Sequence, residues 1–402
     1  MTAPATKGVM RALTADGGDA RFVGGAVRNA LLGVAVSDVD IATPLVPDEV
    51  MRRLKDAGLG AVPTGIEHGT VTAISDGKPF EVTTLRRDIE TDGRRAVIAF
   101  TTDWREDAMR RDFTINALYA GEDGSVFDYF GGLDDLAARR VRFVGDPAMR
   151  IREDYLRILR LFRFHAWYAK GELDAAALAA SIAHKAGLKQ LSGERVQKEL
   201  LRLLEANDPV PALRVMNATQ IALEILPGNL FLSPLLRVVQ IDDALGLAPD
   251  PIFRLARMLA SASDVPNVIG TLKLSNKDRE RLLDLWGTDL DVSPEFSEGD
   301  AHKQLYRLGT QRFKDRIRMH WSGERHETHE SQWRALLALA DDWKKPEFPL
   351  DGRDVMAVGI DEGPKIGVLL RDIEQFWVEN DFAPDRLALL AKLKEVALKA
   401  HN

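Results

Sequence analysis

The segment from Arg21 to Thr43 constrains the fold more than any other part of this sequence. Its order of apolar, glycine and polar residues predicts a short strand, a turn at Gly24–Gly25, a short helix and a second strand. Glycines at a strand end let backbone N–H groups approach an anion, and the following helix N-terminus adds partial positive charge. Because Arg28 falls in the first turns of that helix, the segment suggests a phosphate site, although a diglycine turn alone is more often only a turn.

Two aspartates lie in the second strand of this segment, which we expect over residues 36–42. Alternate residues of a strand point to the same side, so Asp38 and Asp40 are predicted to share one face. Paired carboxylates suit Mg²⁺, and two ions can activate an attacking hydroxyl and neutralise a leaving oxygen. Glu81 would be a third carboxylate if its strand lies beside this one. Each feature by itself is also typical of a cap, a turn or a surface charge.

The remaining chain changes character near residue 145. Short β-like runs alternate with brief helical stretches before that point, and long helical patterns follow from Pro147 onward. We therefore predict an α+β fold, with a mixed-sheet head followed by an all-helical neck, body and tail. The expected domains are 1–145 (head), 146–210 (neck), 211–345 (body) and 346–402 (tail). The expected strands are 22–23, 36–42, 69–75, 80–85, 97–101 and 115–120.

Composition excludes several kinds of site. The 402 residues contain no cysteine, which excludes disulfides and thiolate-bound zinc and makes a reducing cytoplasm the expected location. No segment approaches the ~20 apolar residues of a membrane span. The net charge is −7, yet nine Lys or Arg and three Asp or Glu occur between Arg139 and Lys170. A local basic surface of this kind can bind a polyanion, whereas an isolated arginine run is more often a solvated helix face.

A helix is predicted to begin at Asp146-Pro147, an N-cap followed by proline. Asp154 and Arg157 are three residues apart and are expected on one face of it. The Asp154 carboxylate can accept a hydrogen bond from the exocyclic amine at N4 of cytosine or N6 of adenine. The Arg157 guanidinium can donate a hydrogen bond to the adjacent ring nitrogen. Guanine and uracil present a carbonyl and an N–H there, which leaves polar groups unpaired and would reject these bases. The alternative is a surface salt bridge.

Six ordered motifs resemble those of the tRNA nucleotidyltransferase and poly(A) polymerase family, within the DNA polymerase beta superfamily. They read GGAVRNALLG, SDVDIAT, FEVTTLRRD, DGR, RRDFTINAL and RIREDYLRILRLFRF. The resemblance is dense from about residue 20 to about 205 and is greatest to the CCA-adding enzymes of bacteria and eukaryotes. It implies template-independent addition of CCA to the 3′ end of tRNA from CTP and ATP, with two Mg²⁺ ions and release of pyrophosphate. The implied partner is tRNA, gripped at its acceptor and TΨC arms, with no membrane and no obligate protein partner.

The resemblance also implies roles for individual residues. Asp38 and Asp40 would bind the catalytic magnesium, with Glu81 as the third catalytic carboxylate. The implied nucleotide contacts are Gly24, Gly25, Arg28, Arg111, Asp112, Asp154, Arg157, Arg160 and Arg163. The segment from Arg86 to Ala99 would be a flexible loop that helps to switch from cytidine to adenosine addition. The tip of that loop is formed by Asp92, Gly93 and Arg94.

Separate predictions concern four positions, Asn29, Arg111, Arg163 and Arg195. Asn29 stands where the family usually has Asp, so it keeps hydrogen bonding but loses the charge. Arg111 is expected to be oriented by the adjacent carboxylate of Asp112. Arg163 falls nearly opposite Asp154 on an ideal helix. Arg195 is expected to buttress the base-reading helix and not to act in catalysis.

Three alternative functions remain open from the sequence. A poly(A) polymerase shares the head chemistry, but a basic, aromatic extension would be expected after the head. A CC- or A-adding partial enzyme is the second alternative, and a CC-adding enzyme should lack the flexible loop, which looks intact here. A non-catalytic RNA-binding descendant would have lost a metal carboxylate, and none is missing.

Overall fold

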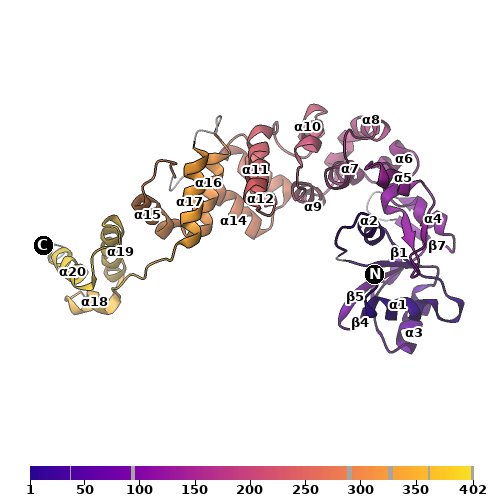
Figure 1. The fold of residues 1–402 in the computed structure, drawn as a ribbon, viewed down its shortest axis with the longest axis horizontal. Coiled ribbons are helices and arrows are strands. Elements are labelled where there is room, and N and C mark those ends of the chain that lie inside the picture. The colour runs from indigo at the N-terminus through magenta and orange to yellow at the C-terminus, as the bar shows by residue number, and fades with distance from the viewer. Residues whose placement is uncertain (37, 92–95, 288–291, 325–328, 361–362, 400–402) are drawn as a thin grey trace. The chain divides into compact units, whose positions relative to one another are not determined.

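A computed structural model describes residues 1–402 except 37, 92–95, 288–291, 325–328, 361–362 and 400–402 (Figure 1). Its described part divides into two units. Unit 1 consists of Met1–Leu230, Pro249–Pro251 and Pro266–Leu274, and unit 2 consists of Phe231–Ala248, Ile252–Val265 and Ser275–Asn402. The predicted tip of the flexible loop, Asp92, Gly93 and Arg94, lies outside the described residues.

A seven-stranded sheet organises the first part of unit 1, in the order β3-β4-β5-β2-β1-β8-β9. Its strands are β1 (Arg21–Val23), β2 (Asp40–Thr43), β3 (Gly60–Gly65), β4 (Thr70–Ser75), β5 (Lys78–Thr84), β8 (Leu118–Ala120) and β9 (Val126–Asp128). The β2 and β5 strands pair in parallel and the other neighbours pair antiparallel. The sheet is therefore mixed, as predicted. A separate two-stranded sheet joins β6 (Arg86–Thr91) to β7 (Ala96–Phe100).

The strand predictions fail where tertiary pairing ends a strand. The expected strand over 36–42 is wrong in its first half, because β2 begins only at Asp40. Its neighbour β1 ends at Val23, where the chain turns at Gly24 with φ of 66°, so β1 does not extend far enough to continue its ladder with β2 before Asp40. The expected strand over 115–120 begins late for a similar reason, since Thr114–Asn116 form a 3-10 turn. Strands β3, β6 and β9 were not predicted.

Helices of the head flank the sheet. They are α1 (Pro4–Thr14), α2 (Gly25–Leu31), α3 (Pro47–Asp56), α4 (Trp104–Met109) and α5 (Gly132–Ala137). The α1 and α3 helices pack against β4, and α1 buries Val9, Met10 and Leu13 completely. These three positions recur with the spacing of one helix face, which explains why α1 forms where it does.

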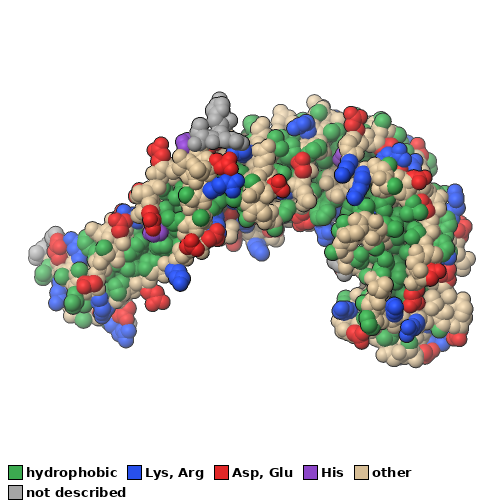
Figure 2. Space-filling model, viewed as in Figure 1, with side chains coloured by type: hydrophobic (Ala, Val, Ile, Leu, Met, Phe, Trp, Pro, Cys, Tyr) green, Lys and Arg blue, Asp and Glu red, His purple; other side chains and the backbone are tan. Residues whose placement is uncertain are grey.

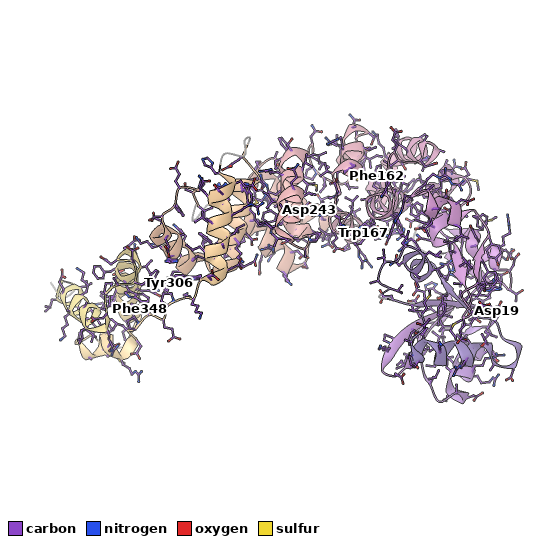
Figure 3. The ribbon with its side chains drawn as sticks, viewed as in Figure 1. Asp19, Phe162, Trp167, Asp243, Tyr306 and Phe348 are labelled. Carbon is purple, nitrogen blue, oxygen red and sulfur yellow. The ribbon has the colours of Figure 1, made fainter. Side chains whose placement is uncertain are left out.

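The neck helices are α6 (Pro147–Glu153), α7 (Leu156–Tyr168), α8 (Ala175–His184), α9 (Gly193–Leu204) and α10 (Val210–Ala218). The predicted start of α6 is confirmed, because the Asp146 side chain accepts a hydrogen bond from the Met149 N–H at 2.7 Å and Pro147 occupies the first turn. The helix does not continue as predicted. Asp154 has extended backbone (φ −157°), and α7 begins two residues later and packs on α9. Phe162 of α7 is fully buried (Figure 3).

The rest of the chain is helical. Its helices are α11 (Leu232–Leu245), α12 (Pro251–Met258), α13 (Val265–Leu272), α14 (Asn276–Leu285), α15 (Glu298–Leu308), α16 (Thr310–Trp321), α17 (Glu330–Asp342), α18 (Gly352–Ala357), α19 (Pro364–Glu379) and α20 (Arg386–Lys399). Two apolar cores occur in unit 2. One is built on Trp321 and Trp333, and the other contains Tyr306, Trp377 and the partly buried Phe348 (Figure 3). The described part thus confirms the predicted α+β fold with a helical remainder.

The surface carries charges of both signs. On the face drawn in Figure 2, acidic and basic side chains are interspersed along the helices as well as over the head. None of the helices among the described residues is long and apolar enough to cross a membrane.

Candidate active site

Most of the residues proposed from the sequence meet at one cavity of unit 1, with a volume of about 530 Å³. The cavity is bounded by the turn after β1, the start of β2, the segment that follows α4, and the neck helices α7 and α9. Its lining residues are Gly24, Gly25, Arg28, Asp40, Arg111, Asp112, Asn116, Asp154, Leu156, Arg157, Arg160, Phe164 and Arg195. Of the predicted site residues that the structure describes, Asp38, Glu81 and Arg163 are not among them.

The turn after β1 has a backbone conformation at Gly24 that favours glycine. Gly24 has φ of 66° and ψ of −122°, a conformation that residues with a side chain rarely adopt. A Cβ atom at Gly24 would lie 3.5 Å from Nη1 of Arg111 and 3.5 Å from the carbonyl oxygen of Asn116. These are ordinary van der Waals distances, so it is the positive φ that requires glycine here, and the Arg111 guanidinium lies beside the turn.

Arg28 is held almost entirely by neutral groups. It donates from Nε (3.1 Å) and Nη2 (2.9 Å) to Oδ1 of Asn29, and from Nη2 to the Tyr168 hydroxyl at 2.8 Å. Its Nη1 donates to Oδ1 of Asn116, and its guanidinium lies 4.0 Å from the centre of the Tyr168 ring. Burial lowers the pKa of Arg28. Asn29 thus supplies the hydrogen bonds expected at its position without neutralising the arginine.

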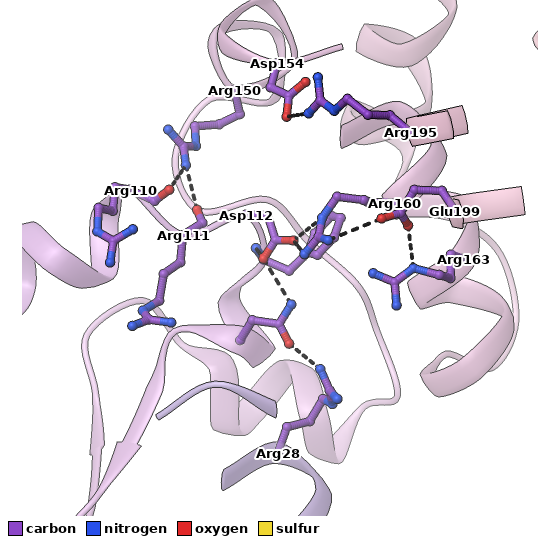
Figure 4. Close-up of polar contacts among 12 residues, drawn as sticks. Arg28, Arg110, Arg111, Asp112, Arg150, Asp154, Arg160, Arg163, Arg195 and Glu199 are labelled. Atoms are coloured by element: carbon purple, nitrogen blue, oxygen red, sulfur yellow. Dashed lines mark hydrogen bonds and ion pairs between the residues drawn. The ribbon is translucent and has the colours of Figure 1, made fainter. Parts of the chain in front are cut away.

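Arg111 is held by a carboxylate and a phenol. Its Nε donates to the Tyr119 hydroxyl at 3.1 Å and its Nη2 donates to Oδ2 of Asp107 at 3.0 Å. Burial opposes the charge of Arg111, but the contacts with Tyr119 and Asp107 outweigh that effect and raise its pKa. The backbone is fixed as well, since Nη2 of Arg150 donates to the Arg111 carbonyl oxygen at 2.7 Å (Figure 4). The prediction that Asp112 orients Arg111 is therefore wrong.

Asp112 instead joins the head to the neck. Its Oδ1 accepts from the Phe113 N–H at 2.8 Å and from Nδ2 of Asn116 at 3.0 Å, and its Oδ2 accepts from Nε of Arg160 at 2.8 Å. Burial alone would raise the pKa of Asp112, but Arg160 and these hydrogen bonds lower it to about 2. Because Asn116 also accepts from Arg28, a continuous hydrogen-bonded chain links the two arginines (Figure 4).

The network ends in the neck at Glu199. Its Oε1 lies 3.4 Å from Nη1 of Arg160, and its Oε2 accepts from Nε of Arg163 at 2.5 Å. Arg163 is thus directed to Glu199. Four arginines of the predicted basic cluster are held in internal ion pairs of this kind, whereas Arg140, Arg152 and Lys170 of the same stretch are exposed. The four internally paired arginines are Arg150, Arg157, Arg160 and Arg163.

Asp154 and Arg157 do not form the predicted pair on one helix face. Asp154 lies in the break between α6 and α7, where Oδ1 accepts from the Leu156 N–H at 3.1 Å and Oδ2 accepts from Nη2 of Arg195 at 2.8 Å. Arg157 donates from Nη1 to Oε2 of Glu153 at 2.5 Å. Both side chains nevertheless line the cavity, and the contact of Arg195 with Asp154 is the kind of support predicted for Arg195.

The carboxylates of the head lie at the start of β2. Asp40 is the register partner of Glu81 in the parallel β2–β5 pair, which confirms that the two strands are neighbours. Burial and the negative charges of Glu81 and Asp38 raise the pKa of Asp40, and Arg111 opposes this shift. Asp38 is exposed and precedes the strand. Within the described residues, no three His, Asp or Glu side chains are grouped closely enough to hold a metal ion.

Several residues of the site escaped the sequence analysis. Asn116 belongs to the RRDFTINAL motif but was not singled out, and Tyr119 follows in an otherwise apolar strand. Tyr168 and Glu199 contact Arg28 and Arg160 from the neck. The one local signal was the hydroxyl of Tyr119 between apolar neighbours in Leu118–Ala120, a run that is fully buried. A buried polar group needs a hydrogen-bond partner.

The comparisons with known proteins agree with this geometry. Residues 20–142 match a family model described as "Poly A polymerase head domain", and residues 172–230 match one described as "Probable RNA and SrmB- binding site of polymerase A". A human relative, "CCA tRNA nucleotidyltransferase 1, mitochondrial", is 35% identical over 387 residues and covers 93% of this chain and 86% of its own length. A "CCA-adding enzyme" from Levilactobacillus brevis is 31% identical over 408 residues, or 96% of each chain. The crystal structure of the Bacillus stearothermophilus CCA-adding enzyme in complex with CTP is similar with a TM-score of 0.78 and 26% identity, over 100% of this chain and 99% of the other.

Proposed function

This chain belongs to the family of CCA-adding enzymes, and we propose on that basis that it adds C, C and A to the 3′ end of tRNA from CTP and ATP. The observation that carries the proposal is the single cavity in which Asp40, the free face of Arg111 and the pair Asp154 and Arg157 meet. Nucleotidyl transfer needs contacts for the phosphates and the base of a nucleoside triphosphate and a group that activates the tRNA hydroxyl, and the cavity contains a candidate for each.

The phosphate contacts fall mainly to Arg111. Arginine has five N–H donors, and two of those on Arg111 are used by Tyr119 and Asp107, so three remain without a partner among the described residues. The Nη1 donors are directed at the Gly24 turn. Arg28 has four donations already made, so it offers one N–H and a positive charge. Charge-assisted bonds of this kind hold phosphate oxygens and stabilise the charge that develops on the leaving pyrophosphate.

The carboxylates of the head are of the donor type that a divalent cation requires. Burial and the negative charges of Glu81 and Asp38 raise the pKa of Asp40, and hard oxygen donors are the ligands that Mg²⁺ prefers. We propose that Asp38 and Asp40 hold two Mg²⁺ ions, with Glu81 as the third catalytic carboxylate. The bound metal would activate the tRNA 3′-hydroxyl for attack on the α-phosphate and neutralise the leaving group. Arg111 lies near enough to Asp40 to lower the pKa of that carboxyl group. The arginine that would bind phosphate and the carboxylate that would bind metal therefore act at the same end of the nucleotide.

Base selection falls to Asp154 and Arg157. A carboxylate has two oxygens with room for several donors, so Asp154 can keep its bond to Arg195 while it accepts from the exocyclic amine of cytosine or adenine. Arg157 uses Nη1 for Glu153 and for the Arg150 carbonyl oxygen, while its Nη2 has no partner among the described residues and can donate to the ring nitrogen. Uracil and guanine reverse both donor and acceptor, which leaves these groups unpaired.

The tRNA itself is assigned to the helical part of the chain. The match of residues 172–230 to an RNA-binding model supports this, and duplex RNA is recognised chiefly by shape and backbone contacts. We propose that the neck, body and tail grip the acceptor and TΨC arms. A cytoplasmic location, the domain boundaries and the independence from a protein partner stay predictions.

The test uses purified protein, Mg²⁺ and three tRNA transcripts, which end before the first C, before the second C and before A. Each nucleotide is offered separately. We expect CMP incorporation on the first two transcripts, AMP incorporation on the third, and no incorporation from GTP or UTP. A poly(A) polymerase is the second candidate, because the head matches a model of that name. Long A tails on any RNA would establish it, and addition of A alone or of C alone would show a partial enzyme.

A further inference from the structure

A closed triangle of hydrogen bonds joins Tyr119, Asp107 and Arg111, the arginine to which the phosphate contacts are assigned above. The Tyr119 hydroxyl on β8 donates to Oδ2 of Asp107 on α4 at 2.6 Å and accepts from Nε of Arg111 at 3.1 Å. The third side is the bond from Nη2 of Arg111 to the same Oδ2, at 3.0 Å. Tyr119 and Asp107 are 0% and 1% exposed, so water cannot replace either partner.

Only one assignment of donors and acceptors satisfies all three hydrogen bonds of the triangle. A guanidinium only donates and an ionised carboxylate only accepts, so the Tyr119 proton must point to Asp107 and a lone pair must face Arg111. Burial raises the pKa of Tyr119, although Arg111 opposes that shift. Burial alone would raise the pKa of Asp107 too, but Arg111 and Arg110 lower it to about 2. The triangle therefore keeps one arrangement of protons over the whole range of ordinary pH.

Two contacts on one guanidinium fix the direction in which the remaining donors point. A planar group held at Nε and at Nη2 cannot rotate about its own axis without losing a bond. The free donors of Arg111 then face the Gly24 turn, where its Nη1 lies 3.5 Å from the position of a Cβ atom. Arg111 is 18% exposed, so without this hold its side chain could also turn toward solvent.

We propose that Tyr119, together with Asp107, is a positioning residue that holds Arg111 toward the triphosphate of the incoming nucleotide. The proposal rests on the proposed function, in which Arg111 contacts phosphate. Tyr119 does not line the cavity, so it acts only through Arg111. Preorganisation of this kind improves binding and transition-state stabilisation because no orientation has to be acquired during the reaction.

Tyr119→Phe is the sharpest test, because it removes the hydroxyl and keeps the ring. The ring packs edge-on against Trp104 with centroids 5.2 Å apart, and against Tyr129 at 6.1 Å. A change at Asp107 is less clean, since that carboxylate also accepts from the Arg86 N–H at 3.2 Å and from Arg110. The matched control is Tyr129→Phe, which loses a hydroxyl of the same aromatic cluster that accepts from Arg21.

The measurements separate a positioning role from a structural one. Y119F is expected to raise KM for both CTP and ATP by roughly 3- to 10-fold, which is the net effect of losing one ordinary hydrogen bond. Its rejection of GTP and UTP should stay unchanged, and so should its affinity for cytidine, which has no phosphate. Y129F should match the unsubstituted protein. In an Arg111→Ala background Y119F should add no further loss of CTP affinity, because the partner through which it acts is gone.

The outcomes also distinguish this proposal from the proposed function. If the unsubstituted protein binds CTP in a direct titration but adds no nucleotide, the proposed function is wrong and the titration still tests the triangle. If Y119F binds CTP as tightly as the unsubstituted protein, or loses cytidine and CTP affinity equally, the positioning role is wrong. If the unsubstituted protein does not bind CTP, both proposals are wrong. Should Y119F fail to fold, Tyr119→Met in the same titration provides a second variant that lacks the hydroxyl.

Discussion

The charge of Asp112 is expected to stabilise unit 1 by about 2.5 kcal/mol, and Asp112→Asn tests this value. The pKa of Asp112 is lowered to about 2 from an ordinary value of 3.8. This lowering of the pKa, at about 1.4 kcal/mol per pKa unit, corresponds to about 2.5 kcal/mol in favour of the ionised form. The four groups that contact Asp112 are all donors: the Phe113 N–H, the Asn116 amide and two nitrogens of Arg160. An asparagine has one acceptor oxygen and must turn its NH₂ toward one of these donors.

The pH dependence has a definite sign. A carboxyl group whose pKa is lower in the folded state stabilises the protein fully above its unfolded pKa, and the stabilisation disappears as the pH falls through the folded pKa. The unsubstituted protein should therefore be more stable than D112N by a constant amount from pH 7 to about pH 4, and the difference should shrink between about pH 4 and pH 2.

Urea unfolding of both proteins at a series of pH values measures this difference. The control is Asp123→Asn, since Asp123 also has a lowered pKa, through Ser125, but lies in an exposed turn, where water replaces the lost contacts. A difference below about 0.5 kcal/mol for D112N at pH 7, or a difference that grows as the pH falls, would refute the reasoning.

Three further substitutions address the chemistry of the cavity. Asp40→Ala should abolish addition of both C and A because it removes the half-buried carboxylate next to Glu81; near-normal turnover would exclude a metal role, and Asp48→Ala, at an exposed aspartate of α3, is the control. Asp154→Ala should allow incorporation from UTP and GTP, and unchanged rejection of both in single-nucleotide assays would remove Asp154 from base selection. Asn29→Asp should raise KM for CTP and ATP alike by roughly 2- to 5-fold, because a carboxylate at Oδ1 would neutralise Arg28; an unchanged KM in initial-rate measurements would contradict this.

Local sequence patterns were sufficient for much of the fold and for the membership of the site. The α+β order, the turn at Gly24 and the start of α6 at Asp146 depend on residues within a few positions of one another, and short-range backbone preferences decide them. The ordered motifs also pointed to most of the residues that line the cavity. Strand ends were less predictable, because β2 begins only where β1 provides residues to pair with.

Only the tertiary structure decided which partner each charged residue has. Sequence proximity paired Arg111 with Asp112 and Asp154 with Arg157, whereas in space Arg111 pairs with Asp107 and Tyr119, and Asp154 pairs with Arg195 from α9. The reason is physical: an arginine or carboxylate gains from any partner within reach, and burial selects the one whose geometry satisfies every donor and acceptor. The sequence determined by itself which chemical groups are present and roughly where each element begins. Contacts between residues far apart in the sequence, such as Arg28 and Tyr168 at a separation of 140 residues, determined how those groups face one another.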